Sequence, residues 1–170
     1  MIVRPEVSND EVMVRSIHVA AFQSEDGVEP VEARLLDQLR TDPGWLTPFS
    51  LVAELNGTIV GHGVCTRGYV GETSVLALGP IAVHPTAQRV GVGSAIMLTM
   101  IRSADAAKEQ LIALLGSPDY YGRFGFEPST NVAIVAPQVQ WGEFFQVLRL
   151  ASFSPDTNGQ FRYAEPFNRL

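Results

Sequence analysis

The first quarter of the chain changes from a strand pattern to two stretches with helical spacing. Residues Ile2 to Arg4 are apolar and β-prone, which predicts a short strand. Between Asp10 and Ala21, apolar residues recur at the spacing of one helix face. The stretch from Pro30 to Leu39 repeats this spacing until Asp42-Pro43-Gly44 interrupts it. The pattern therefore predicts one strand followed by two amphipathic helices.

The next part of the chain has the pattern of extended strands. Ser50 to Leu55 and Thr58 to Thr66 flank Asn56-Gly57, a dipeptide typical of a tight hairpin. Thr73 to Val83 is a long apolar run that contains Gly79-Pro80. Because proline cannot donate to a strand ladder, it indicates an edge, a bulge or a break, and we expect a bulge here.

The remaining pattern is that of a helix, a buried strand and a set of shorter elements. Ser94 to Arg102 is apolar almost all round, Leu111 to Leu115 predicts a short buried strand, and Pro118 to Arg123 predicts a short helix or turn. Apolar residues alternate with polar ones from Asn131 to Val135 and from Phe144 to Leu150, which predicts strands that close the sheet. The fold class is α/β with a mixed sheet.

Composition narrows the classes of protein and partner. With 46% apolar and 18% charged residues, the chain has the profile of a globular protein, and we expect one domain over residues 1–170. A net charge of −6 without a basic run disfavours nucleic acid as a partner. Cys65 is the only cysteine, and Val92 to Ile101 is too short to cross a membrane. No secretory signal is visible, so we expect a cytoplasmic protein that spans no membrane.

A glycine-containing segment between a strand and a helix has the properties of an anion-binding turn. Its glycines allow close approach of the backbone, and the free N–H groups of the following helix favour an anion. A P-loop is excluded because the lysine is missing, and a Rossmann loop because Ile96 takes the third glycine position. The alternative is a turn that the glycines merely shape. The segment consists of Gln88, Arg89, Val90, Gly91, Val92, Gly93 and Ser94.

Two ordered motifs resemble those of a known family. Leu78 to Pro85, followed by Gln88-x-x-Gly91-x-Gly93, resembles the acyl-CoA-binding motif of the GNAT acyltransferases, and Tyr120 to Phe126 resembles their second, aromatic-rich motif. The N-terminal His18-x-x-Ala21-Phe22 resembles one branch of the same family. The likeness covers nearly the whole chain and is weakest in the C-terminal part. It implies a GNAT-like, mostly antiparallel central sheet flanked by helices, with a bulged strand at Gly79-Pro80.

The resemblance also implies roles for particular residues. The pantetheine arm of acetyl-CoA would bond to the exposed strand edge at Ile81, Ala82 and Val83, and its phosphates would lie on the segment from Gln88 to Ser94. Tyr121 would protonate the departing thiolate as the general acid. Its alternative role is packing in an aromatic cluster. One departure is Leu114, which stands where many members of the family carry an asparagine.

The expected activity is therefore transfer of an acetyl group from acetyl-CoA to a primary amine by direct attack in a ternary complex, without a metal. A small-molecule acceptor is slightly favoured over a peptide or protein, and a homodimer stays open. A non-catalytic acyl-CoA-binding sensor or interaction module is the alternative. A metal-dependent lyase or hydrolase is disfavoured, because the histidines lack ligand-pair spacing.

The sequence names no general base and no acceptor site. The strand-associated candidates Glu54, His62, Glu72 and His84 are not distinguished by their spacing, and each is also compatible with a structural role. The acidic stretch from Glu25 to Glu29 is either a rim for a cationic acceptor or a solvated loop.

Overall fold

The computed structural model describes residues 1–170. The α-helices are α1 (Glu11–Phe22), α2 (Val31–Arg40), α3 (Val92–Ala106) and α4 (Pro118–Tyr121). The strands are β1 (Ile2–Pro5), β2 (Trp45–Leu55), β3 (Thr58–Val70), β4 (Thr73–Val83), β5 (Leu111–Leu115), β6 (Glu127–Pro128), β7 (Ile134–Val135), β8 (Phe145–Arg149) and β9 (Gly159–Arg162). Short 3-10 segments are η1 (Ser8–Asp10), η2 (Pro85–Ala87), η3 (Gly122–Phe124), η4 (Ser129–Val132), η5 (Val139–Phe144) and η6 (Glu165–Arg169).

The strands form a mixed sheet in the order β1-β2-β3-β4-β5-β8-β6. Neighbours along this order are antiparallel except β4 and β5, which are parallel. Strand β9 pairs with the end of β3 and, in parallel, with β7. This topology confirms the expected mixed and mostly antiparallel sheet.

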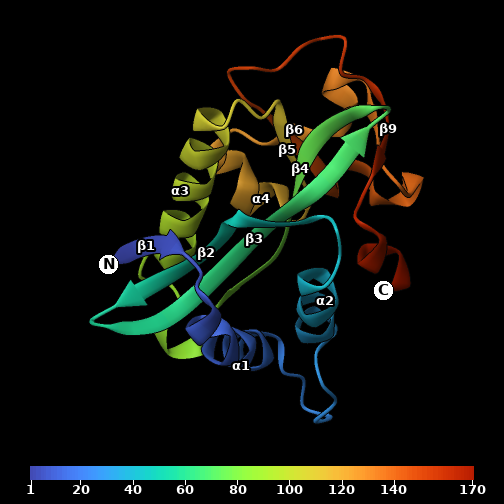
Figure 1. Cartoon of the computed structure of the whole chain (residues 1–170). Coiled ribbons are helices and arrows are strands. Elements are labelled where there is room, and N and C mark those ends of the chain that lie inside the picture. The colour runs from blue at the N-terminus through green and yellow to red at the C-terminus, as the bar shows by residue number, and fades with distance from the viewer.

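The two faces of the sheet are covered by different helices. Val52 and Val64 pack with Val14 of α1 and Leu36 of α2, whereas neighbouring Ala53 packs with Ile96 of α3. Successive side chains of a strand point to opposite faces, so α1 and α2 lie on one side and α3 on the other. Figure 1 shows the long β2–β3 hairpin running between them.

The hairpin and the bulge form where the sequence predicts them. Asn56 and Gly57 both adopt positive φ angles, of 52° and 78°, as a two-residue turn of this type requires. Farther along, the register of β3 and β4 shifts between Gly63 and Cys65, so that Gly79-Pro80 of β4 lies opposite a single residue of β3. This extra residue confirms the bulge.

Beyond the bulge, β4 loses its partner on one side. Strand β5 pairs with β4 only at Leu76 and Ala77, while β3 continues to pair with β4 as far as Val83. The backbone of β4 from Leu78 to Val83 thus has no strand beside it on the side of β5. The two parallel strands diverge, and this divergence positions the site described below.

Two large apolar clusters fix the sheet. One lies beneath α3 and contains Met97, Met100 and Ile112, all fully buried. The other joins β5, β8 and β9 through Phe145 and Phe161. None of the helices has the length and apolar character that crossing a membrane requires.

The prediction of a strand at Asn131 and Val132 is wrong. These residues belong to η4, and Ala133 then takes a positive φ of 56°, which ends any extended run. Only Ile134–Val135 is extended, and it pairs with β9 rather than closing the main sheet. Local alternation misled here because Ile134 is buried by contacts with distant residues, including Phe161.

Candidate active site

A cleft of about 550 Å³ opens where β4 and β5 diverge. Its walls come from the end of α1, the outer part of β4, the turn before α3 and the segment around α4. Of the sequence-predicted ligand-binding residues, all but Val90 line it; Val90 is 60% exposed to solvent. The lining ones are Ile81, Ala82, Val83, Gln88, Arg89, Gly91, Val92, Gly93 and Ser94.

The turn before α3 presents the first amides of that helix to the cleft. Gly91 precedes α3 in the left-handed conformation, with a φ of 91°, and Arg89 also has a positive φ of 65°. The side-chain amide of Gln88 donates to the carbonyl of Val83 at 3.0 Å and so fastens this turn to β4. Because the first N–H groups of a helix have no partner within it, this end of α3 has unpaired donors of the kind that favour an anion.

Tyr120 and Arg123 also line the cleft, and sequence reasoning missed both. The Arg123 guanidinium lies 4.6 Å from the centre of the Tyr120 ring, and its Nε donates to the Tyr120 carbonyl at 2.9 Å. With Arg89, the cleft therefore has two cations near the N-terminus of α3. The available signal was Arg123 itself, the only cation between Pro118 and Phe126.

Tyr121 lies deeper than Tyr120 and does not line the cleft. It packs against the cluster that contains Leu78 and Leu114, which directly follow the last paired residues of β4 and β5. Burial raises the pKa of Tyr121 to about 12, so its phenol is protonated at neutral pH. A protonated phenol therefore lies near the point where the two strands separate.

Three of the candidates for a general base, two carboxylates and a histidine near strand ends, make contacts outside the cleft. Glu54 is paired with Arg4, Glu72 is exposed, and His84 Nδ1 lies 2.8 Å from the Thr86 hydroxyl. None of these residues lines the cleft. No group of three or more His, Cys, Asp or Glu side chains is arranged to hold a metal ion.

Cys65 and the acidic stretch also lie apart from the cleft lining. Cys65 is buried, and burial raises the pKa of its thiol, so it is not an activated nucleophile. The acidic stretch from Glu25 to Glu29 is solvent-exposed, and Glu29 forms an ion pair with Arg15.

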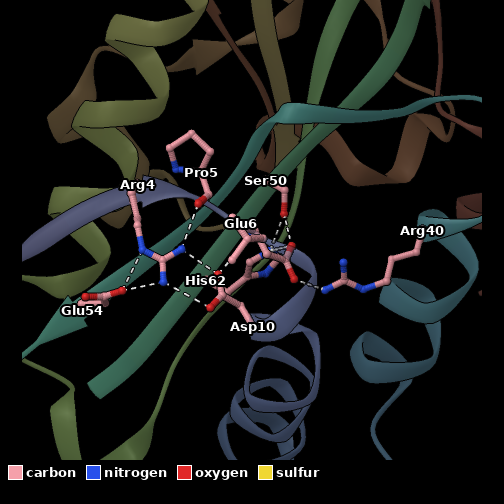
Figure 2. Close-up of polar contacts among 9 residues, drawn as sticks. Arg4, Pro5, Glu6, Asp10, Arg40, Ser50, Glu54 and His62 are labelled. Atoms are coloured by element: carbon pink, nitrogen blue, oxygen red, sulfur yellow. Dashed lines mark hydrogen bonds and ion pairs between the residues drawn. The ribbon is translucent and has the colours of Figure 1, made fainter. Parts of the chain in front are cut away.

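A second polar region lies beneath α1 and α2 (Figure 2). Glu6 is buried there and accepts hydrogen bonds from Arg40 and from the hydroxyl of Ser50. Burial alone would raise the pKa of Glu6, but hydrogen bonds from His62, Arg40 and Ser50 outweigh it and lower the pKa to about 2. Glu6 is therefore a carboxylate throughout the neutral range, and it lines a second cavity of about 370 Å³.

Comparison with known families and curated proteins gives consistent matches. Residues 12–126 match the model of a family described as the acetyltransferase (GNAT) family. The chain is 36% identical over 101 residues to YjhQ, an uncharacterised N-acetyltransferase of Escherichia coli K12, in a match that covers 57% of this chain and 56% of that protein. It is 26% identical over 173 residues to YhbS, another uncharacterised N-acetyltransferase of that strain, with both chains covered completely.

Solved structures resemble the whole fold. The crystal structure of the GNAT family N-acetyltransferase YhbS from Escherichia coli, in complex with CoA, has a TM-score of 0.88 and 26% identity over 99% of this chain and 92% of that one. A GNAT family acetyltransferase from Brucella melitensis, in complex with acetyl-CoA, has a TM-score of 0.77 and 28% identity over 98% and 97% of the two chains.

Proposed function

The chain belongs to the acetyltransferase (GNAT) family and is an acyltransferase, and from this premise we propose that it moves an acetyl group from acetyl-CoA to a primary amine. In this proposal, residues 1–170 act as one catalytic domain and the amine attacks directly in a ternary complex. A small-molecule acceptor is favoured over a peptide or protein, since the cleft has no acidic side chain in its lining to hold a cationic segment.

The observation that carries the proposal is the junction, within one cleft, of an unpaired strand edge and a helix N-terminus. The backbone from Ile81 to Val83 has no strand partner on this edge, although the Val83 carbonyl accepts from Gln88, and this edge suits the amides of a pantetheine arm. The amides from Gly91 to Ser94, with Arg89, suit the diphosphate. The cleft volume of about 550 Å³ is also that of a small-molecule site.

The proposed reaction needs two proton transfers. The amine nitrogen attacks the thioester carbonyl carbon, the carbon–sulfur bond breaks, and the nitrogen loses a proton. The departing thiolate takes a proton from Tyr121, whose pKa of about 12 keeps it protonated until then, and the phenolate regains a proton from solvent when the products leave. A backbone N–H of the bulged strand near Val83 would polarise the thioester carbonyl. Positioning of both substrates supplies the rest of the rate increase.

Ligand binding gives the first test. Acetyl-CoA at 100 times its Kd should add about 2.7 kcal/mol to the free energy of unfolding. For a chain of this length the thermal midpoint should rise by roughly 5 to 10 °C. ATP and NAD at the same concentrations are the controls. No shift with millimolar acetyl-CoA would contradict the proposal, and a shift without thiol release in a panel of amines would favour the non-catalytic sensor.

A matched pair of tyrosine variants tests the chemistry. Tyr121→Phe removes the donor and should lower kcat by roughly 100-fold or more. Tyr120→Phe removes a neighbouring hydroxyl from the cleft wall and should mainly raise KM for acetyl-CoA. Equal effects of the two substitutions on kcat would remove Tyr121 from the mechanism.

A further inference from the structure

Four buried side chains from distant parts of the sequence form one hydrogen-bonded network, which consists of His18, His62, Ser50 and Glu6. His18 Nε2 of α1 lies 2.9 Å from His62 Nδ1 of β3, and His62 Nε2 lies 2.9 Å from the hydroxyl of Ser50. The same His62 nitrogen is 3.4 Å from a carboxylate oxygen of Glu6. Both imidazole rings have no exposed surface. Figure 2 shows the part of this network that contains Glu6, Ser50 and His62.

The positions of the protons in this network can be assigned by elimination. Glu6 is ionised and only accepts, so the Ser50 hydroxyl donates to it. The Ser50 oxygen then accepts from His62 Nε2–H, which leaves His62 Nδ1 without a proton in the neutral ring. His62 Nδ1 must therefore accept from His18 Nε2–H. His18 Nδ1 is consequently left as a bare lone pair.

That lone pair has no partner in the protein. His18 Nδ1 is one of two buried side-chain atoms without a hydrogen bond, the other being the hydroxyl of Thr66. A buried polar group left unpaired loses the hydrogen bonds that it would make to water, so an unpaired acceptor calls for a physical reason. Structural packing explains Glu6, Ser50 and His62, which are all paired, but it does not explain the unpaired Nδ1 of His18.

The His18 ring that carries this lone pair packs against a residue of the cleft wall. Phe22 stands one helical turn after His18, its ring stacks on the His18 ring at 6.2 Å, and Phe22 lines the cleft. On the sheet, His62 is directly opposite Ala82, which also lines the cleft. The aromatic ring that covers His18 is therefore part of the wall beside the strand at which the thioester would lie.

We propose that His18 is the base of the reaction, receiving through Nδ1 the proton that the acceptor amine loses, with His62, Ser50 and Glu6 as positioning residues. The inference rests on the proposed function. The amine N–H bond breaks and an Nδ1–H bond forms through a bridging water, because the buried ring does not itself line the cleft. The Nε2 proton of His18 can shift toward His62, which moves the positive charge toward the Glu6 carboxylate. When the product leaves, Nδ1 returns its proton to water in the cleft.

The charges around the two rings show why His18 depends on its partners to take up a proton. Burial, then His62 and Arg40, lower the pKa of His18 to about 3, while Glu6 acts in the opposite direction. Burial likewise lowers the pKa of His62, and Glu6 again opposes it. Strand β4, which also packs against α1, carries no titratable side chain between Thr73 and Val83. His18 is thus uncharged with its lone pair free at neutral pH.

Nitrogen-15 NMR of the protein tests the assignment without any acceptor. The expected spectrum at pH 7 has His18 and His62 both neutral, each protonated on Nε2 alone. A neutral His18 with its proton on Nδ1 overturns the proposal, because no lone pair would then face away from His62. This measurement uses the unsubstituted protein, so it remains decisive even where a His18 variant does not fold.

Kinetics with acetyl-CoA and the fastest amine of the panel tests the role. His18→Gln should lower kcat about 100-fold at pH 7. It should leave the midpoint shift with acetyl-CoA and the KM for acetyl-CoA unchanged, and imidazole in the buffer should restore part of the rate to His18→Ala.

The outcomes separate the two proposals. Asp156→Asn changes an exposed side chain outside both the network and the cleft lining, and it should keep the wild-type rate. A His18→Gln variant that binds acetyl-CoA and has the wild-type kcat at pH 7 overturns the base role but not the proposed function. Thiol release by the wild-type protein with none of the amines overturns the proposed function, and the base role with it.

Discussion

The open cleft contains polar groups without partners, whereas most polar groups of the buried network are paired. In the cleft, Arg89 and Arg123 are exposed and the amides at the start of α3 have no partner within the helix. In the network, Glu6, Ser50 and His62 are buried and bound to one another. Unpaired groups in a cleft are available to a ligand, whereas paired groups in a core define a unique packing of the elements that carry them.

The two regions meet at one pair of strands. Ala82 of β4 lines the cleft, and His62, opposite it on β3, belongs to the network. Changes in the network are therefore expected to alter mainly stability and proton transfer, and changes in the cleft mainly ligand binding. The substitutions below can break this division.

Glu6→Ala should have the largest effect on stability. It leaves the Arg40 charge and the buried Ser50 and His62 groups without their common acceptor. Breaking one side of such a buried pair costs about 3 to 5 kcal/mol of unfolding free energy. Denaturant unfolding measures this loss. Glu72→Ala, which removes an exposed carboxylate, is the matched control and should change the free energy by less than about 0.5 kcal/mol.

The network should also make stability depend on pH. The pKa of His18 is about 3 in the folded protein and near 6.5 when unfolded, so the unfolded chain takes up the proton first. The contribution of unprotonated His18 to the free energy of unfolding is complete above pH 6.5 and falls as pH decreases toward 3. One proton corresponds to about 1.4 kcal/mol per pH unit, which gives a loss of about 2 kcal/mol between pH 6.5 and 5.

Unfolding free energies at several pH values check this slope, with His18→Gln as the variant that should reduce it, while His62 keeps its own contribution. An unsubstituted protein whose free energy of unfolding is constant from pH 6.5 to 5 would show that His18 titrates normally.

The cleft was far more accessible to sequence analysis than the network. The turn from Gln88 to Ser94 is a continuous segment in which glycine, helix start and cation follow one another, so its chemistry is visible in local order. The hairpin at Asn56-Gly57 and the bulge at Gly79-Pro80 were predictable for the same reason, since each residue type limits its own backbone.

The network could not be predicted in this way. His18 and His62 are 44 positions apart, and only the packing of α1 on β3 brings them together. His62 was named as one of several candidates, but no spacing identifies its partners. The C-terminal segment failed for a related reason, because β7 owes its short extended form to pairing with β9. Arg123 was missed because the sequence does not show in which direction its side chain points, and the structure places it over the Tyr120 ring.

Gly93→Ala should have the smallest effect and tests how the cleft wall is built. A Cβ at Gly93 would lie 2.8 Å from the Tyr120 hydroxyl oxygen, which is too close, and 4.0 Å from the ring carbon that carries it. Alanine is better than glycine in a helix by up to about 1 kcal/mol, so clash and propensity roughly cancel. In a Tyr120→Phe background the clash is absent, and the same substitution should stabilise the protein by up to about 1 kcal/mol. A double-mutant cycle by denaturant unfolding measures this coupling. Equal effects of Gly93→Ala in both backgrounds would mean that the Tyr120 hydroxyl does not lie against the start of α3, and that Gly93 is kept free for the ligand alone.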